Sequence, residues 1–164
     1  MVSHSWIFWA PLVAASLHIL EEFVWPGGFL DWYRRYRPAI AASITPRLIL
    51  VVNGILLLAC NAAALLGPTP RGVALWLTVV AILLTNVGFH VVAVMRTGVY
   101  SPGVITAVVL YLPLAIYGFS YFLRHGLASI GTAVLALVVG IAYPIWSLRN
   151  HRRRAGRPGP GFPP

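Results

Sequence analysis

The sequence predicts an all-α membrane protein, a polytopic helix bundle with five transmembrane helices. Two observations predict this class. Hydrophobic residues make up 59% of the 164 residues and charged residues only 9%, whereas a soluble domain carries about 25% charged residues. Apolar runs close to the ~20 residues needed to cross hydrocarbon also alternate with short polar links. We therefore expect a single membrane domain.

Five apolar runs fit this length, and each ends at a recognisable break. The first ends at Pro-Gly-Gly; no positive residue precedes it and it contains His and Glu, so we expect a retained span rather than a signal peptide. The second begins with proline, which is favoured in a first helical turn, and ends at a Gly-Pro-Thr-Pro turn. Short links separate the remaining runs. The predicted transmembrane domain, residues 1–148, contains helices at about 6–25, 46–66, 71–95, 102–123 and 127–148.

Two segments fall outside the five helices. Residues 29–38 combine aromatic and basic side chains, a composition typical of a segment lying in the lipid headgroup region. Residues 149–164 contain mainly arginine, glycine and proline, so we expect a disordered basic cytoplasmic tail.

The arginines predict the orientation. The formal charge of +9 comes from arginine alone, because the chain has no lysine. With five spans, only Arg71 and Arg124 fall on one side and the other ten arginines fall on the opposite side. Positive residues favour the cytoplasmic side. We therefore expect a multi-pass protein of the inner (plasma) membrane with its N-terminus outside and its C-terminus in the cytoplasm, and a lipid bilayer rather than nucleic acid as its partner.

One cluster of ionisable residues stands out inside the first apolar run. His18, Glu21 and Glu22 are spaced i, i+3 and i+4, which places them on one side of a helix. The only other acid in the chain is Asp31. An ionisable side chain in hydrocarbon costs roughly 2.5–3.5 kcal/mol and is rare without a partner or a function. The cluster is therefore a candidate functional site.

Polar residues of the other helices fall at the same membrane depth. With a rise of 1.5 Å per residue, His18 lies ~10 Å from the cytoplasmic end of its helix and His90 ~9 Å from Arg96. Asn86 precedes His90 by four residues and shares its face. The remaining residues at this level are Asn53, Tyr100, Ser101 and Thr106. This agreement in depth predicts one polar site in the cytoplasmic half of the bundle.

The residue types at this level suit a divalent metal such as zinc, iron, manganese or magnesium, because imidazoles and carboxylates on facing helices hold metals in bundle interiors. We take His18, Glu22 and His90 as first-choice ligands, with Glu21 as a further ligand or a general base. Asn86 would orient a reacting group. Tyr100 and Thr106 complete the catalytic candidates.

Three other interpretations stay open. The first is a structural ion network of the cluster with Arg47 or Arg34. The second is a proton relay or cation pathway of a transporter. The third is a metal-free site in which one glutamic acid, Glu21 or Glu22, donates a proton. The nearly apolar outer half argues against a transporter. Other polar and aromatic residues have purely structural interpretations. Asn53 and Asn61 would form helix-to-helix hydrogen bonds, and Cys60 would be a buried small side chain. Trp32, Tyr33 and Tyr36 would form an interfacial belt, and His4, His125 and His151 would be solvated.

Three motifs carry a resemblance to a known family. They are His18-Ile-Leu-Glu21-Glu22, Asn86-Val-Gly-Phe-His90 and Tyr100-Ser-Pro102-Gly103-Val-Ile-Thr106. In this order the chain resembles the HXXEE family of small bacterial membrane proteins, over the first four helices. The resemblance implies that the motif residues work together, but it implies no reaction.

The sequence thus favours an intramembrane enzyme that acts on a lipophilic small molecule of the isoprenoid, polyketide or acyl-lipid class. Its chemistry would be metal-dependent hydrolysis or acid-type isomerisation or cyclisation. The alternatives are a metal-free terpenoid cyclase with a glutamic acid as general acid, an ion- or proton-coupled transporter, and a structural membrane protein. The oligomeric state is not predicted.

Overall fold

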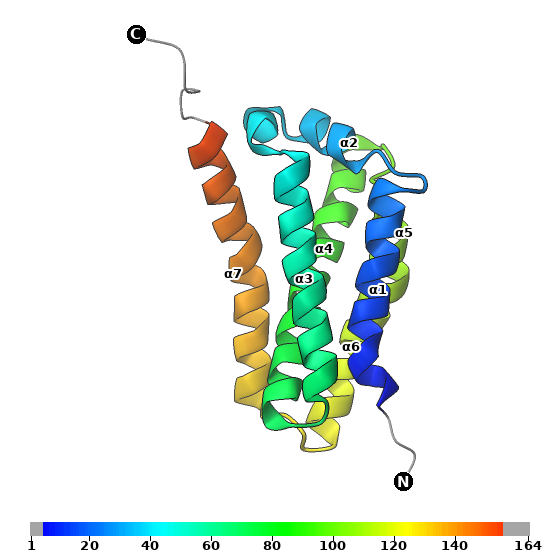
Figure 1. Cartoon of the computed structure of the whole chain (residues 1–164), viewed down its shortest axis with the longest axis vertical. Helices are drawn as coiled ribbons and strands as arrows, with labels where there is room; N and C mark the ends of the chain where they lie inside the picture. Colours follow the sequence, from blue (N-terminus) through cyan, green and yellow to red (C-terminus); the bar gives the residue numbers. More distant parts are fainter. Residues whose placement is uncertain (1–4, 156–164) are drawn as a thin grey trace.

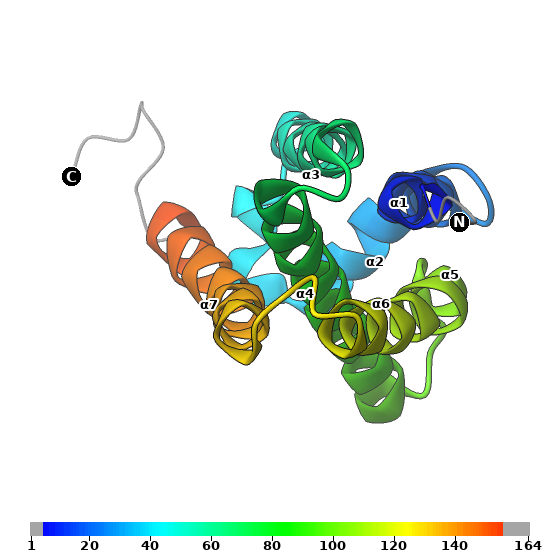
Figure 2. The same ribbon diagram turned by 90° about the horizontal axis from the view of Figure 1, so that it is seen from below.

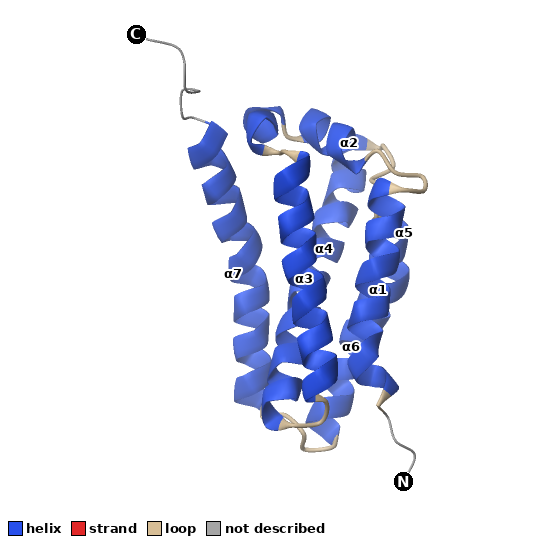
Figure 3. Cartoon of the chain, in the orientation of Figure 1, coloured by secondary structure: helices blue, strands red, loops and turns tan. Residues whose placement is uncertain are grey.

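The computed structural model describes residues 5–155, and every regular element within this range is helical (Figures 1 and 3). The elements are α1 (Trp6–Phe23), α2 (Phe29–Tyr36), the 3₁₀-helix η1 (Pro38–Ser43), α3 (Pro46–Leu66), α4 (Pro70–Thr97), α5 (Val104–Thr106), the π-helix η2 (Ala107–Tyr111), α6 (Leu112–Arg124) and α7 (Ile130–Ala155). The predicted all-α class is confirmed for the described residues.

The long helices form an up-and-down bundle in which α1, α4 and α7 run one way and α3 and α6 return (Figure 1). Helix α4 is central and packs against α3, α6 and α7 (Figure 2). The approach of α7 to α4 depends on Gly140, where an added Cβ would lie 2.7 Å from the backbone of Ala81. Small residues permit this close packing between membrane helices.

Helices α3 and α4 begin with the same local device. Thr45 and Thr69 accept hydrogen bonds from the backbone N–H groups of Leu48 and Gly72, at 3.2 and 3.0 Å. A proline follows each threonine and occupies the first helical turn, where its missing N–H costs nothing. The threonine and the proline together determine the residue at which each helix begins.

Four helices are long and apolar enough to cross a membrane: Pro46–Leu66, Pro70–Thr97, the continuous segment Val104–Arg124, and Ile130–Ala155. Their length and composition indicate a membrane protein. Helix α1 is not among the four, because its 18 residues include His18 and two glutamates.

The basic tail begins later than the sequence predicts. Helix α7 continues through residues 149–155, which were expected to be disordered. His151, expected to be solvated, is half-buried, and its Nδ1 atom lies 2.8 Å from Oγ of Ser43 in η1. This contact ties the end of α7 to the 3₁₀-helix. The remainder of the predicted tail, 156–164, lies outside the described residues, as does His4.

The segment α2–η1 lies across the end of the bundle where α1, α4 and α7 finish (Figure 1). Phe29 and Trp32 of α2 are buried, and their ring centroids lie 6.1 and 6.3 Å from that of His90. Residues 29–36 therefore form a helix that covers the end of the bundle above the polar cluster, which is more than the interfacial belt the sequence predicts.

Candidate metal centre

The structure brings together three of the predicted ligands, from two helices. Oε1 of Glu22 lies 3.3 Å from Nε2 of His18 and 3.4 Å from Nε2 of His90. All three side chains are buried, and their ligand atoms lie within 4.8 Å of one another. Two ligands of a tetrahedral zinc ion with bonds of about 2.0–2.1 Å are roughly 3.3 Å apart. The glutamate–histidine spacings therefore suit a first-row metal.

The hydrogen bonds around His18 determine which nitrogen carries its proton. The hydroxyl of Thr106 donates to Oε2 of Glu21, so its oxygen is left to accept. That oxygen lies 2.9 Å from Nδ1 of His18, which must then be the donor. Neutral His18 therefore presents the lone pair of Nε2 to the carboxylate of Glu22. Two acceptors facing each other in a buried site repel unless a cation lies between them.

His90 is oriented in the same way. Its Nδ1 atom lies 2.8 Å from Oγ of Ser101, a buried hydroxyl. Its Nε2 atom is buried and has no hydrogen-bond partner among the described residues, although Glu22 lies nearby. A buried polar atom without a partner needs an explanation, and coordination to a metal would provide one. A hydrogen bond at the outer nitrogen of a ligating histidine is typical of metal sites, and here the partner is a hydroxyl.

Gly103 lies against all three candidate ligands. An added Cβ would be 2.7 Å from Cε1 of His18, 2.9 Å from Cγ of Glu22 and 2.9 Å from Cε1 of His90. Its φ of +99° also favours glycine. The close approach expected from the third motif is therefore present, and its backbone forms one wall of the site.

Glu21 has a different environment from Glu22. Its Oε1 accepts hydrogen bonds from the hydroxyl of Tyr100 at 2.6 Å and from the N–H groups of Gly103 and Ile105 at 3.1 and 3.0 Å. Its Oε2 accepts from the N–H of Thr106 at 2.7 Å and from the Thr106 hydroxyl. A carboxylate is well placed at a helix N-terminus, where N–H groups lack partners. Glu21 thus fastens the start of α5 to α1, and it is not part of the three-residue ligand group.

Tyr100 supports this attachment. Partial burial raises the pKa of its hydroxyl, and the hydrogen bond to the Glu21 carboxylate raises the pKa further. The hydroxyl therefore remains protonated at neutral pH and remains a donor to Glu21. The structure thus brings together two of the predicted catalytic residues, Tyr100 and Glu21. They lie beside the ligand group and not at Oε1 of Glu22, where the two histidines meet.

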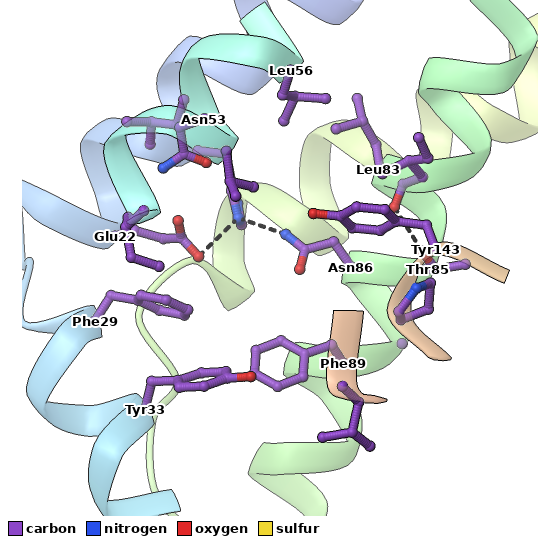
Figure 4. A pocket seen from close by; sticks show the side chains of 18 of the residues that line it. Glu22, Phe29, Tyr33, Asn53, Leu56, Leu83, Thr85, Asn86, Phe89 and Tyr143 are labelled. Atoms are coloured by element: carbon purple, nitrogen blue, oxygen red, sulfur yellow. Dashed lines mark hydrogen bonds and ion pairs between the residues drawn. The ribbon is translucent and has the colours of Figure 1, made fainter. Parts of the chain in front are cut away.

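A cavity of about 700 Å³ adjoins the ligand group. Glu22 and Asn86 point into it from α1 and α4, and Asn53 lines it from α3 (Figure 4). Nδ2 of Asn86 lies 3.0 Å from Nε2 of His18, so the amide donates to the lone pair of neutral His18, and a metal bound at this nitrogen would replace that hydrogen bond. Most other lining residues are apolar, and the volume falls in the ~300–1,000 Å³ range of small-molecule sites.

The alternative ion network is not present among the described residues. Arg34 donates to the carbonyl of Ile44 at 2.9 Å and lies 3.8 Å from Asp31, while Arg47 is exposed. Neither arginine reaches the glutamates of α1. Asn53 makes no hydrogen bond with another described residue and faces the cavity, so its expected helix-to-helix bond is absent.

Sequence reasoning missed the position of Tyr111, and it placed Ser101 at the depth of the site without its contact to His90. The ring of Tyr111 lies 4.8 Å from that of His18, and its buried hydroxyl has no partner among the described residues. Thr106 and Tyr111 are five residues apart and would not share a face of an α-helix. The π-helix η2 lies between them, and such insertions are frequent at functional sites.

A family model described as proteins of unknown function with an HXXEE motif matches residues 9–118. The chain belongs to the HXXEE family. No curated protein and no solved structure matches it. In this HXXEE protein the histidine and the second glutamate of the motif, His18 and Glu22, belong to the ligand group. The first glutamate, Glu21, binds the backbone at the start of α5.

Proposed function

We propose that this HXXEE protein is a metal-dependent membrane enzyme acting on a lipophilic substrate. The observation that carries the proposal is the convergence of two histidine nitrogens on one oxygen of Glu22 at the wall of an apolar cavity. A buried carboxylate beside two imidazole nitrogens is stable when a metal cation binds all three.

The donor set narrows the choice of metal. Two histidines and one carboxylate form the protein part of catalytic zinc sites and of non-haem ferrous sites, both of which keep an open position. Magnesium prefers oxygen ligands and suits this set poorly. Zinc or ferrous iron is therefore the proposed metal, bound by His18, Glu22 and His90.

The bound metal would supply Lewis acidity and a water of lowered pKa for hydrolysis. The chain's own residues have separate parts. Asn86 lies next to the ligand nitrogen of His18 and orients a polar group of the substrate in the cavity. Thr106 holds the proton on Nδ1 of His18. Glu21 and Tyr100 position α5, and with it Gly103 and Thr106.

We also propose that α1 is a fifth span, with the N-terminus outside and the C-terminus in the cytoplasm. Helix α1 runs alongside α3 for most of its length (Figures 1 and 2). The arginines at the α2 end of the bundle are Arg34, Arg35, Arg37, Arg47, Arg96, Arg149, Arg152, Arg153 and Arg154. A green fluorescent protein fused to the C-terminus should fluoresce and a fused alkaline phosphatase should be inactive; the opposite pattern would reverse the orientation.

A second candidate is metal-free acid catalysis, because a proton between Glu22 and His18 would also remove the repulsion between their acceptor atoms. The protonated group would face the same cavity and initiate an isomerisation or cyclisation. The metal content of the purified protein distinguishes the two candidates.

Elemental analysis of the purified full-length protein tests the proposal. Wild type should carry about one zinc or iron ion per chain, and Glu22→Gln and His90→Ala should carry almost none. His125→Ala, which changes an exposed histidine at the opposite end of the bundle, should retain the metal. Wild type without metal after growth in metal-supplemented medium would favour acid catalysis instead.

A further inference from the structure

Two arginines line the cavity in addition to the polar residues of the metal centre. Arg37 follows α2, and Arg96 belongs to the last turn of α4. The guanidinium of Arg37 lies 5.2 Å from the ring centroid of Phe89 and 5.6 Å from that of Tyr36. Cation–π contacts at these distances hold the charge in place.

Neither arginine has an acidic partner in the described part of the chain. Among residues 5–155, Arg34 is the arginine that forms an ion pair, with Asp31. Arg37 is half-buried, so its charge is held against the cavity wall without a counter-ion from the protein. Arg96 is exposed but also lines the cavity. Two cations at one cavity attract an anionic group into it.

The rest of the cavity wall is apolar and is open to the side. Val52 and Ile55 of α3 and Trp146 of α7 line the cavity and are also exposed, Trp146 by 62%. In a bilayer these residues face lipid. An aliphatic chain can therefore enter between α3 and α7 while its polar end remains near the arginines. Figure 4 shows the aromatic rings of Tyr33 and Phe89 side by side within this cavity.

We propose that the cavity binds an amphiphile with one aliphatic or prenyl chain and a phosphate head group. The head would lie between Arg37 and Arg96, and the chain would extend along the apolar wall past Glu22. This inference rests on the proposed function, since it names the substrate class of that enzyme. It assigns Arg37 and Arg96 to substrate binding. The preference of basic residues for the cytoplasmic side explains their charge, but it does not explain why they line the cavity.

The charge and the volume both favour this ligand. A phosphate monoester carries about −1.5 to −2 charges near neutral pH, which matches two guanidinium groups better than a single carboxylate does. Guanidinium groups also bind phosphate oxygens in a bidentate manner. A cavity of about 700 Å³ has room for one chain of moderate length, whereas a bilayer phospholipid would bring two.

Binding of radiolabelled dodecyl phosphate to the full-length protein in phosphatidylcholine nanodiscs tests this proposal, with empty nanodiscs measuring partition into lipid. Wild type should bind one molecule saturably. Arg37→Gln and Arg96→Gln should each weaken binding roughly tenfold or more. Arg35→Gln is the matched control, because Arg35 is exposed on α2 and does not line the cavity; its affinity should stay within about twofold of wild type.

Chain-matched competitors define the head group. Unlabelled dodecyl phosphate should displace the probe, while dodecanol and inorganic phosphate should not do so at the same concentration. Nanodiscs that contain phosphatidylglycerol should bind the probe nearly as well as those without it. Equal binding by Arg37→Gln and wild type, equal competition by dodecanol, or displacement by phosphatidylglycerol would each overturn the proposal.

The measurement separates this inference from the proposed metal function. The metal content is determined on the same preparations, and binding is measured before and after chelation. Head-group-selective binding by a protein that never holds metal would support the ligand site and contradict the metalloenzyme. A protein that binds one metal ion per chain but does not distinguish dodecyl phosphate from dodecanol would support the metalloenzyme and contradict the ligand site.

Discussion

Oε1 of Glu22 lies 3.4 Å from Nε2 of His90, and that nitrogen has no hydrogen bond with any described residue. The two groups come from different helices and are almost completely excluded from solvent. Burial of a nitrogen without a hydrogen-bond partner is costly, and so is burial of a carboxylate. A metal ion bound by this pair and by His18 would satisfy both groups.

Gly103 should be essential for metal binding. A methyl group at this position would come within 3.0 Å of an atom of each of the three proposed ligands. Gly103→Ala should therefore reduce metal content to a small fraction of wild type. Gly28→Ala is the control, because Gly28 also has a positive φ, +82°, but an added Cβ would meet nothing within 4 Å. The control should cost roughly 1–2 kcal/mol of stability and retain the metal; equal metal content in both variants would argue against a ligand group packed on Gly103.

Thr106 should tune metal affinity through His18. Its hydroxyl oxygen accepts from Nδ1 of His18 and its proton goes to Glu21. Thr106→Val removes both interactions and should weaken metal binding about 10–100-fold, the usual effect of losing a partner of a ligating histidine. Thr106→Ser keeps the hydroxyl and should stay near wild type. Competition with a chromophoric chelator measures both affinities, and an unchanged affinity in the valine variant would contradict this role.

The two adjacent glutamates should fail in different ways when replaced. Glu21→Gln replaces one carboxylate oxygen by an NH2 group, which cannot accept. Either the N–H groups of Gly103 and Ile105 or the N–H of Thr106 then lose their acceptor, so the change should destabilise the protein by on the order of 2 kcal/mol. Glu22→Gln should abolish metal binding and change the stability of the metal-free protein less. Thermal unfolding in detergent, after chelation, measures the stabilities. A larger loss of stability in Glu22→Gln than in Glu21→Gln would contradict the assignment.

Alanine should have opposite effects at two helical glycines. At Gly140 an added Cβ would lie 2.7 Å from the Ala81 backbone, so Gly140→Ala should displace α7 and lower the melting temperature. At Gly88 the added Cβ would meet nothing within 4 Å, so the higher helix propensity of alanine should leave stability unchanged or raise it by up to about 1 kcal/mol. Equal melting temperatures would indicate that α7 is not closely packed on α4.

The helices were predictable from the sequence because membrane spans have a strong signal. Apolar runs bounded by prolines and glycines predict α3, which has the expected range, and α4, which is extended by a few residues. The end of α7 was not predictable from composition. Arginine is a good helix former, and the contact between His151 and Ser43 holds the last turns of α7 against η1.

The sequence predicted which residues form the site, but it did not predict the different surroundings of Glu21 and Glu22. The i, i+3, i+4 spacing placed His18, Glu21 and Glu22 on one side of α1. Adjacent helical residues nevertheless point about 100° apart, so Glu21 faces the start of α5 while Glu22 faces the cavity. The N–H groups that bind Glu21 belong to the backbone of residues 103–106, and no side-chain pattern reveals them.

Tyr111 illustrates a second kind of limit. Its ring contacts His18 because η2 is a π-helix, whose i→i+5 hydrogen bonds change the helical period. A reading of the sequence with the α-helical period cannot place Thr106 and Tyr111 beside the same histidine.

X-ray absorption spectroscopy of the bound metal tests the central claim most directly. The account predicts about two imidazoles per metal, the remaining ligands oxygen, and no sulfur, because Cys60 is buried but does not belong to the group of His18, Glu22 and His90. His90→Ala should leave at most one imidazole on any metal that remains. A spectrum without imidazole, or one with a sulfur ligand, would contradict a centre formed by His18, Glu22 and His90.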